Sequence, residues 1–252
     1  MIIKTNGLVL RLDPYSKTSQ IITWLTPDHG RIVTLAKGAK RIKSNLLGQY
    51  DCFNSCELLF YQSRHSSLHI LKECALLTSR PALRSDWRAS FTASYLCDLL
   101  NRLTPLGSAS PPVYLWAENT MDFLAKYGST ETVLNWSELK LLKLLGLSPQ
   151  LSNCINCWSQ EFETGHPLCF SISRGGLLCE KCNRVMDNSI LQLDHDILGM
   201  LRGWENTDTP AMAKRTVCTP KQAESANKFL STFIHYHLQA SLSRDIVSRL
   251  IQ

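Results

Sequence analysis

Two Cys-x-x-Cys pairs constrain the fold of this chain more than any other feature. Cys154/Cys157 and Cys179/Cys182 are separated by 21 residues. Each pair offers two sulfur atoms from one tight turn, and the two pairs together complete a tetrahedral set of thiolates. We therefore predict one structural Zn²⁺ per chain, held by these four cysteines. Since four thiolates leave no open position for water or substrate, the predicted site is not catalytic.

Two other interpretations of these thiols stay open. A redox-active pair of the thioredoxin type uses a single Cys-x-x-Cys motif at a strand–helix junction, whereas two motifs lie here in a loop-rich stretch. His166 and Cys169 lie between the pairs and could replace one of the four ligands. The scattered cysteines are expected to be small buried apolar side chains: Cys52, Cys56, Cys74, Cys97, Cys169 and Cys218.

Residues 1–80 have the pattern of a small β-barrel. Leu8, Leu10 and Leu12 alternate with Val9, Arg11 and Asp13, as in a half-buried strand. Strand-like segments follow at 19–26, 30–38, 56–62 and 67–73, with one long connection from 38 to 52. The turn at 27–30 holds a proline and a glycine. Five short strands of this kind fit an oligonucleotide-binding (OB) barrel, and an SH3-like barrel is the alternative.

From Pro81 the period becomes helical. Trp87, Phe91 and Tyr95 begin one apolar face that continues through Leu96, Leu99, Leu100 and Leu103. Further helices are predicted over 114–127 and 131–145, the second ended by Gly146 and deeply buried through its leucines. Thr219-Pro220-Lys221-Gln222 is a capping box that opens the last helix.

The predicted fold is therefore an α+β chain of several domains. An N-terminal OB barrel covers 1–80, and an α-helical domain covers 81–150 and 190–252. A four-cysteine zinc-finger insert at 151–189 interrupts the helical domain.

The positive charge of the chain is concentrated in the barrel. Residues 1–80 hold eleven Lys and Arg against five Asp and Glu, whereas residues 81–252 are balanced. Four cations gather at Lys37, Lys40, Arg41 and Lys43, where a strand passes into the long connection. A charge run is often only a solvated loop, but a basic groove on an OB barrel is typical of nucleic-acid binding. Tyr15, Trp24, Phe53, Phe60 and Tyr61 are candidates for base stacking, although most should lie in the core.

Motifs of the common catalytic sites are missing from the sequence. It contains no Gly-x-x-x-x-Gly-Lys-Ser/Thr, His-Glu-x-x-His or Gly-x-Ser-x-Gly motif, and no zinc-deaminase signature. No apolar run approaches 18 residues, and the first residues lack the pattern of an export signal. We expect a cytoplasmic protein that is not an enzyme and does not bind membranes.

One set of short motifs runs along most of the chain. In the barrel it comprises Arg11 and residues 15–19, 25–31 and 36–41. It continues through 138–142, 145–147, the first Cys-x-x-Cys pair, Phe170-Ser171 and 175–179. In these motifs the chain resembles the bacterial RecO family of DNA repair proteins. Near the end of the chain the resemblance is limited to Ser243-Arg244.

The resemblance implies an OB fold, a helical domain and a zinc-finger insert. It also implies a nucleoid-associated mediator of recombination that binds single- and double-stranded DNA and anneals complementary strands. Such a mediator binds the acidic C-terminal tail of single-strand-binding protein and, with RecR, helps load RecA. DNA is then expected to engage Arg31, Lys37, Lys40, Arg41 and Lys43, with Arg11 in support. The alternatives are an RNA-binding OB protein and a zinc-ribbon enzyme acting on nucleic acid.

Overall fold

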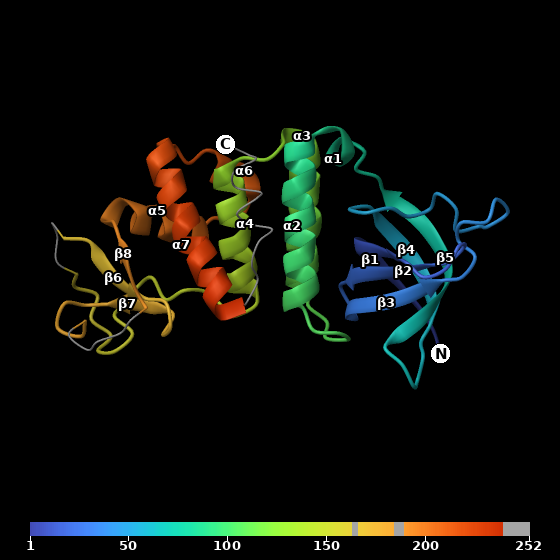
Figure 1. Cartoon of the computed structure of the whole chain (residues 1–252), viewed down its shortest axis with the longest axis horizontal. Coiled ribbons are helices and arrows are strands. Elements are labelled where there is room, and N and C mark those ends of the chain that lie inside the picture. Colours follow the sequence, from blue (N-terminus) through green and yellow to red (C-terminus); the bar gives the residue numbers. More distant parts are fainter. Residues whose placement is uncertain (163–165, 184–188, 239–252) are drawn as a thin grey trace. The chain divides into compact units, whose positions relative to one another are not determined.

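The computed structural model describes residues 1–162, 166–183 and 189–238, and the chain is α+β as predicted. It forms two compact units, Met1–Gly128 and Ser129–Gln252 (Figure 1). The helices between residues 82 and 127 thus belong to the same unit as the barrel, whereas the sequence analysis grouped them with the later helices. The division into domains at 1–80, 81–150 with 190–252, and 151–189 stays a prediction. Residues 239–252, with Ser243 and Arg244, lie outside the described part.

The first unit begins with a closed five-stranded barrel, which confirms the predicted fold class (Figure 1). Its strands are β1 (Ile2–Pro14), β2 (Gln20–Thr26), β3 (Gly30–Ala36), β4 (Ser55–Tyr61) and β5 (Leu68–Thr78). The strand order is β1-β2-β3-β5-β4, with β4 returning to β1. The pairing of β3 with β5 is parallel and the other pairings are antiparallel. A crossover from β3 to β5 that closes five strands is the OB arrangement.

Strand β1 departs from the predicted alternation. Leu8, Val9 and Leu10 are all buried, so both faces of the strand are covered here. The register with β2 shifts between Val9 and Arg11, which inserts an extra residue and changes the direction of the side chains. Helices α2 (Trp87–Leu103) and α3 (Pro111–Tyr127) of the same unit also pack against β1. Because this part of the strand is covered on both faces, it has no solvent-facing positions, and the alternation of buried and exposed residues predicted from the sequence does not apply to it.

Two longer helices follow the barrel after the short helix α1 (Ala82–Ser85). They are α2 (Trp87–Leu103) and α3 (Pro111–Tyr127). Asp86 caps α2 by accepting hydrogen bonds from the backbone N–H groups of Arg88 and Ala89. The buried face of α2 is made of Ala89, Thr92, Ala93, Tyr95, Leu96, Cys97, Leu99 and Leu100. Trp87 and Phe91 were predicted on that face, which is wrong, because both side chains are exposed.

Arg80, between β5 and α1, is a buried charge at the centre of the first unit. Its side chain is only 2% exposed, and its Nη1 donates to the carbonyl oxygen of Phe53 at 2.6 Å and to Ser55 Oγ at 2.7 Å. Its other nitrogens form ion pairs with Glu118 at 2.8 Å and Asp122 at 2.7 Å, both on α3. The guanidinium group therefore joins the start of β4 to α3 through buried, charge-assisted hydrogen bonds.

In the residues that the structure describes, the second unit has four helices and a small sheet. The helices are α4 (Glu131–Leu144), α5 (His195–Glu205), α6 (Pro210–Lys214) and α7 (Pro220–Leu238). The sheet contains β6 (Leu168–Ser171), β7 (Gly176–Leu178) and β8 (Ile190–Leu193), in the order β7-β6-β8. No helix in the described ranges is long and apolar enough to cross a membrane.

The ends of α4 and α7 follow the sequence signals. Gly146 has φ +71 just after α4, and the predicted capping box opens α7, where Thr219 and Gln222 exchange backbone and side-chain hydrogen bonds. Helix α4 is buried from Thr132 to Leu139 as expected. Leu147, however, is exposed, since the helix ends before it. The inward side chain predicted at Leu238 lies outside the described side chains.

Replacing Arg80 by methionine should destabilise the first unit strongly. The change removes the Arg80 donors from the Phe53 carbonyl, Ser55 and the two carboxylates, although Glu118 keeps a hydrogen bond from Ser55 Oγ at 2.6 Å. Breaking a buried ion pair by removing one partner typically costs about 3–5 kcal/mol. Chemical denaturation of the full chain measures the loss in the free energy of unfolding. Arg84→Met is the control, since its ion pair with Asp51 is largely exposed and worth about 0–1 kcal/mol. Equal effects of the two variants would contradict the central role of Arg80.

Candidate metal centre and nucleic-acid interface

The four predicted metal ligands lie on two tight turns brought together by strand β7. In the first turn the backbone N–H of Trp158 donates to the Cys154 oxygen at 2.9 Å. In the second, the N–H of Cys182 donates to the Cys179 oxygen at 3.0 Å. The N–H of Ile155 donates to the oxygen of Leu177 on β7 at 2.9 Å, so the first turn is fastened next to the strand that leads into the second.

The sulfur atoms of the two turns have the spacing of a tetrahedral metal site. Those of Cys154, Cys157, Cys179 and Cys182 all lie within 4.8 Å of one another, and Cys157 Sγ lies 3.6 Å from Cys179 Sγ. A tetrahedron with metal–sulfur bonds of about 2.3 Å has sulfur–sulfur edges of about 3.8 Å. The cluster predicted from the sequence is thus confirmed as a group that could hold a metal ion.

The surroundings of the four cysteines shift the pKa values of two of the thiols in opposite directions. Burial tends to raise the pKa of the Cys154 thiol, but backbone N–H groups of Cys179, Cys157 and Asn156 around its sulfur lower that pKa to about 6. Burial and the hydrogen bonds to neighbouring thiols raise the pKa of Cys179 to about 12. A cysteine binds a metal ion as a thiolate. The backbone hydrogen bonds favour the thiolate form of Cys154, whereas a bound cation would be needed to keep all four sulfur atoms ionised at once.

His166 and Cys169 do not belong to this group. Among the described residues, the four cysteines form the one group that could hold a metal ion. The two tight turns that carry them, at 154–159 and 179–182, are called the first and second knuckle below. Cys169 Sγ instead accepts a hydrogen bond from Asn183 Nδ2 at 2.9 Å, and burial raises the pKa of its thiol. Of the six scattered cysteines, Cys56, Cys74 and Cys97 are buried, as expected, and the other three are half-buried.

The predicted basic loop, residues 37–46, begins directly after β3, and its cations are exposed. Lys37, Lys40, Arg41 and Lys43 are all exposed, and none forms an ion pair with another residue in the described part of the chain. Unpaired cations on a protein surface keep their full attraction for phosphate.

The backbone of this loop is nevertheless fixed to the barrel. The N–H of Gly38 donates to Ser19 Oγ and that of Lys40 to the oxygen of Thr18, both at 3.0 Å. Ala39 and Leu46 are buried members of the barrel core. The loop is thus anchored by apolar side chains and by the β1–β2 turn, while its cations face solvent.

Two further cations predicted to contact DNA have partners inside the first unit. Arg11 forms an ion pair with Asp13 at 2.7 Å. Arg31 donates from Nε to the carbonyl oxygen of Thr104 at 2.9 Å and from Nη1 to Asn101 Oδ1 at 3.2 Å, and its burial lowers its pKa. Arg31 therefore secures the end of α2, and a part of either arginine in DNA binding stays a prediction.

The stacking candidates separate into two groups. Trp24, Phe53 and Phe60 are buried, and Trp24 Nε1 donates to Thr34 Oγ1 at 2.9 Å within the core. Tyr15 and Tyr61 are exposed. Tyr15 lies in the β1–β2 turn, and Thr18 and Ser19 of the same turn accept hydrogen bonds from the basic loop.

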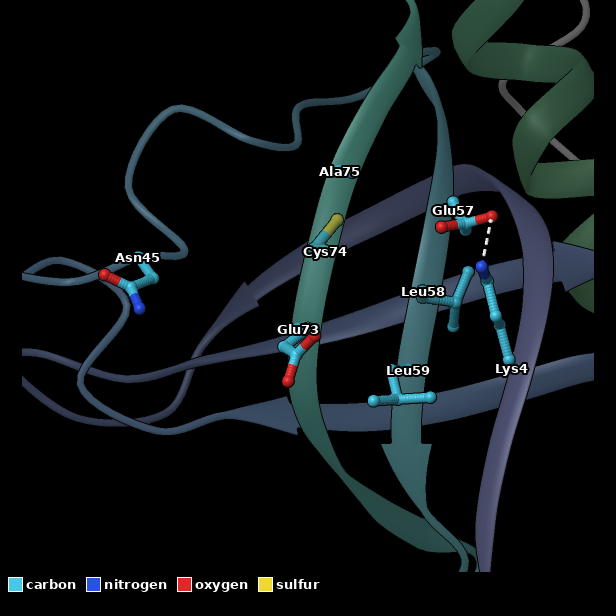
Figure 2. A pocket seen from close by; sticks show the side chains of 8 residues that line it. All are labelled: Lys4, Asn45, Glu57, Leu58, Leu59, Glu73, Cys74 and Ala75. Carbon is cyan, nitrogen blue, oxygen red and sulfur yellow. Dashed lines mark ion pairs between the residues drawn. The ribbon is translucent and has the colours of Figure 1, made fainter.

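A groove of about 450 Å³ lies on the barrel, and none of the four loop cations is among the residues that line it (Figure 2). Asn45 of the β3–β4 loop borders it opposite Glu73 and Cys74 of β5. Lys4 points toward Glu57 and forms an ion pair with it at 2.9 Å. Glu73 forms an ion pair with Lys72 at 3.2 Å. Lys4, the one cation among the residues that line the groove, is thus already paired with Glu57 and is not free to bind phosphate.

Two family descriptions together match nearly the whole chain. The one for the recombination protein O N terminal covers residues 1–80, and the one for the recombination protein O C terminal covers residues 84–245. The chain belongs to the RecO family.

Curated RecO relatives match over most of their length. The DNA repair protein RecO of Alkaliphilus metalliredigens is 29% identical over 239 residues, which are 94% of both chains. That of Halalkalibacterium halodurans is 30% identical over 180 residues, 71% of this chain and 68% of its own. That of Bacillus subtilis is 29% identical over 184 residues, 72% of this chain and 69% of its own. The family resemblance seen in the sequence is therefore confirmed.

The four cysteines of this RecO-family chain should hold one metal ion. Cys157→Ser removes a ligand from the cluster, so metal analysis of the purified protein should find the ion lost or weakly held. Cys169→Ser is the matched control and should keep the ion, because its sulfur lies outside the cluster. A wild-type protein that holds no metal and whose four thiols all titrate freely in the native state would refute the site.

Proposed function

We propose that this RecO-family chain is a mediator of DNA repair and recombination that binds single- and double-stranded DNA and anneals complementary strands. In this proposal it acts without catalysis and, together with RecR, helps load RecA onto DNA coated with single-strand-binding protein. DNA engages the barrel through Arg31, Lys37, Lys40, Arg41 and Lys43, with Arg11 in support.

The exposure of the four loop cations carries the DNA-binding proposal. Contacts between cations and phosphates release condensed counterions, and this supplies most of the affinity that does not depend on sequence. The loop projects its cations while its backbone and its apolar side chains are held by the barrel. Tyr15 supplies an exposed aromatic ring on the adjoining turn, which fits the combination of cations and stacking rings in OB domains.

The metal proposed for the four-cysteine cluster is Zn²⁺, with a structural role. Tetrahedral coordination by thiolates is typical of zinc, and the apparent binding energy in small zinc domains is about 10–16 kcal/mol. The apolar cluster next to the cysteines is small, with Leu178 as its one fully buried aliphatic residue among the described ones. The two turns that carry the cysteines therefore depend on the metal for their stability, whereas Phe170 and Leu177 of the insert are buried without it.

The protein partners proposed here rest on the family resemblance. The region after residue 80 carries no net charge, so it is a weaker electrostatic partner for DNA than the barrel. We assign binding of the acidic tail of single-strand-binding protein to the helical part, with an apolar contact and a cation at its rim.

Replacing Lys40 and Arg41 together by alanine tests DNA binding. Since both side chains are exposed, metal content and the unfolding transition should stay near wild type. Affinity for single- and double-stranded DNA should fall, and the slope of log K against log salt should decrease by about 2. Lys221→Ala with Lys228→Ala on α7 removes the same charge elsewhere and is the control. Unchanged affinity and slope in the loop variant would show a merely solvated loop, and tighter binding of RNA than DNA would favour an RNA-binding protein.

The same loop variant separates DNA binding from partner binding. A peptide with the acidic tail of single-strand-binding protein should bind the Lys40→Ala/Arg41→Ala chain as tightly as wild type, because its proposed site lies outside the barrel. Fluorescence anisotropy of the labelled peptide measures this. A parallel loss of peptide and DNA affinity would place the tail on the basic loop instead.

A further inference from the structure

Trp158 is a large aromatic residue in an unusual place. It directly follows the ligand Cys157 in the first knuckle and is 68% exposed. Its φ is +62, in the left-handed region that bulky side chains rarely adopt. Phe53 is the one other non-glycine residue with positive φ in the described part of the chain, and it is buried in the first unit.

The knuckle requires this backbone conformation. The N–H of Trp158 donates to the Cys154 oxygen at 2.9 Å, and the N–H of Cys154 donates to the Ser159 oxygen at 2.8 Å. These bonds close the turn that presents Cys154 and Cys157 to the metal site. Glycine adopts positive φ without steric cost, so local physical chemistry favours glycine at this position.

Packing does not compensate for the strain at Trp158. An indole that is 68% exposed gains little from burial, so the packing of its side chain does not offset the cost of the left-handed backbone. A residue that breaks a local rule without a folding gain points to function. The turn holds the ring rigidly, which lowers the cost of ordering it when a ligand binds.

The surroundings of Trp158 indicate the class of ligand. Arg174 is exposed and its Nη2 donates to Asn156 Oδ1 at 3.2 Å, two residues before the tryptophan. Lys181, in the second knuckle, is also exposed. Glu161 and Glu180 balance these cations, so the surface does not form a continuous track for the phosphates of a duplex. An exposed indole with a few cations suits one unstacked base of a single strand.

We propose that Trp158 is a stacking platform for one base of single-stranded DNA, with Arg174 contacting a neighbouring phosphate. This inference rests on the proposed DNA-binding function and adds a second contact, on the metal-binding insert, that selects single strands. Bases within a duplex are already stacked on each other, so Trp158 contributes nothing to duplex binding.

Trp158→Gly tests this in the full metal-loaded chain. Because glycine relieves the backbone strain, metal content should be retained and unfolding should need as much denaturant as in wild type, or more. Affinity for a labelled oligodeoxythymidine at fixed salt should fall by about 5-fold or more, and affinity for a duplex should not change. Trp158→Phe keeps an aromatic face and should retain most of the single-strand affinity. Trp87→Ala removes another exposed indole and should leave both affinities unchanged.

The outcomes separate this inference from the proposed function. Unchanged single-strand affinity in Trp158→Gly, alongside weaker binding by the Lys40→Ala/Arg41→Ala chain, would overturn the stacking role and keep DNA binding on the barrel. An equal loss for single-stranded and duplex DNA in Trp158→Gly would also overturn it, as would the same loss in Trp87→Ala. A wild-type chain without affinity for either DNA would refute the proposed function itself.

Discussion

The first unit depends on one buried charge. A guanidinium group can leave water only if its donors find acceptors, and Arg80 finds them on segments far apart in the sequence. The carbonyl of Phe53, the hydroxyl of Ser55 and the carboxylates of α3 must all be in place for the group to be satisfied. The barrel and α3 therefore form one cooperative body, which agrees with the compact unit Met1–Gly128. Phe53 also ends the β3–β4 connection, so Arg80 fixes the end of the loop that presents the cations.

The second unit meets a different constraint around its small sheet. The apolar cluster at the knuckles has Cys154, Leu178 and Cys179 as its buried members, with a few half-buried neighbours. So few side chains stabilise the knuckles only weakly, and a metal ion on the four sulfur atoms would take over the role of a larger core there. Backbone hydrogen bonds close the first knuckle, so a residue such as Trp158 can be exposed in a left-handed conformation there.

The sequence predicted features that depend on local chemistry. The knuckle spacing, the capping box at Thr219, the glycine after α4 and the run of cations each have a physical cause within a few residues, and the structure contains all of them. Features that depend on tertiary partners were missed or wrong. No local signal distinguishes the buried Arg80 from an exposed arginine, or shows that Arg31 is held by Thr104. Trp87 and Phe91 fit an apolar stripe, but the buried face of α2 instead includes the small residues Ala89 and Ala93. Trp158 carried no signal in the sequence, because its backbone conformation becomes visible only in the folded turn.

The anchoring of the basic loop has a consequence for the energetics of the whole barrel. Ala39 and Leu46 are core residues, so the segment between them is ordered before any ligand arrives. Binding of an anion then restricts only the ends of long side chains, and association needs no folding step that would slow it. Ligand binding and folding are also thermodynamically linked, because an unfolded barrel no longer presents the cations in this arrangement. The proposed binding of DNA to the loop would therefore shift the folding equilibrium toward the native barrel by a free energy that grows with the logarithm of ligand concentration.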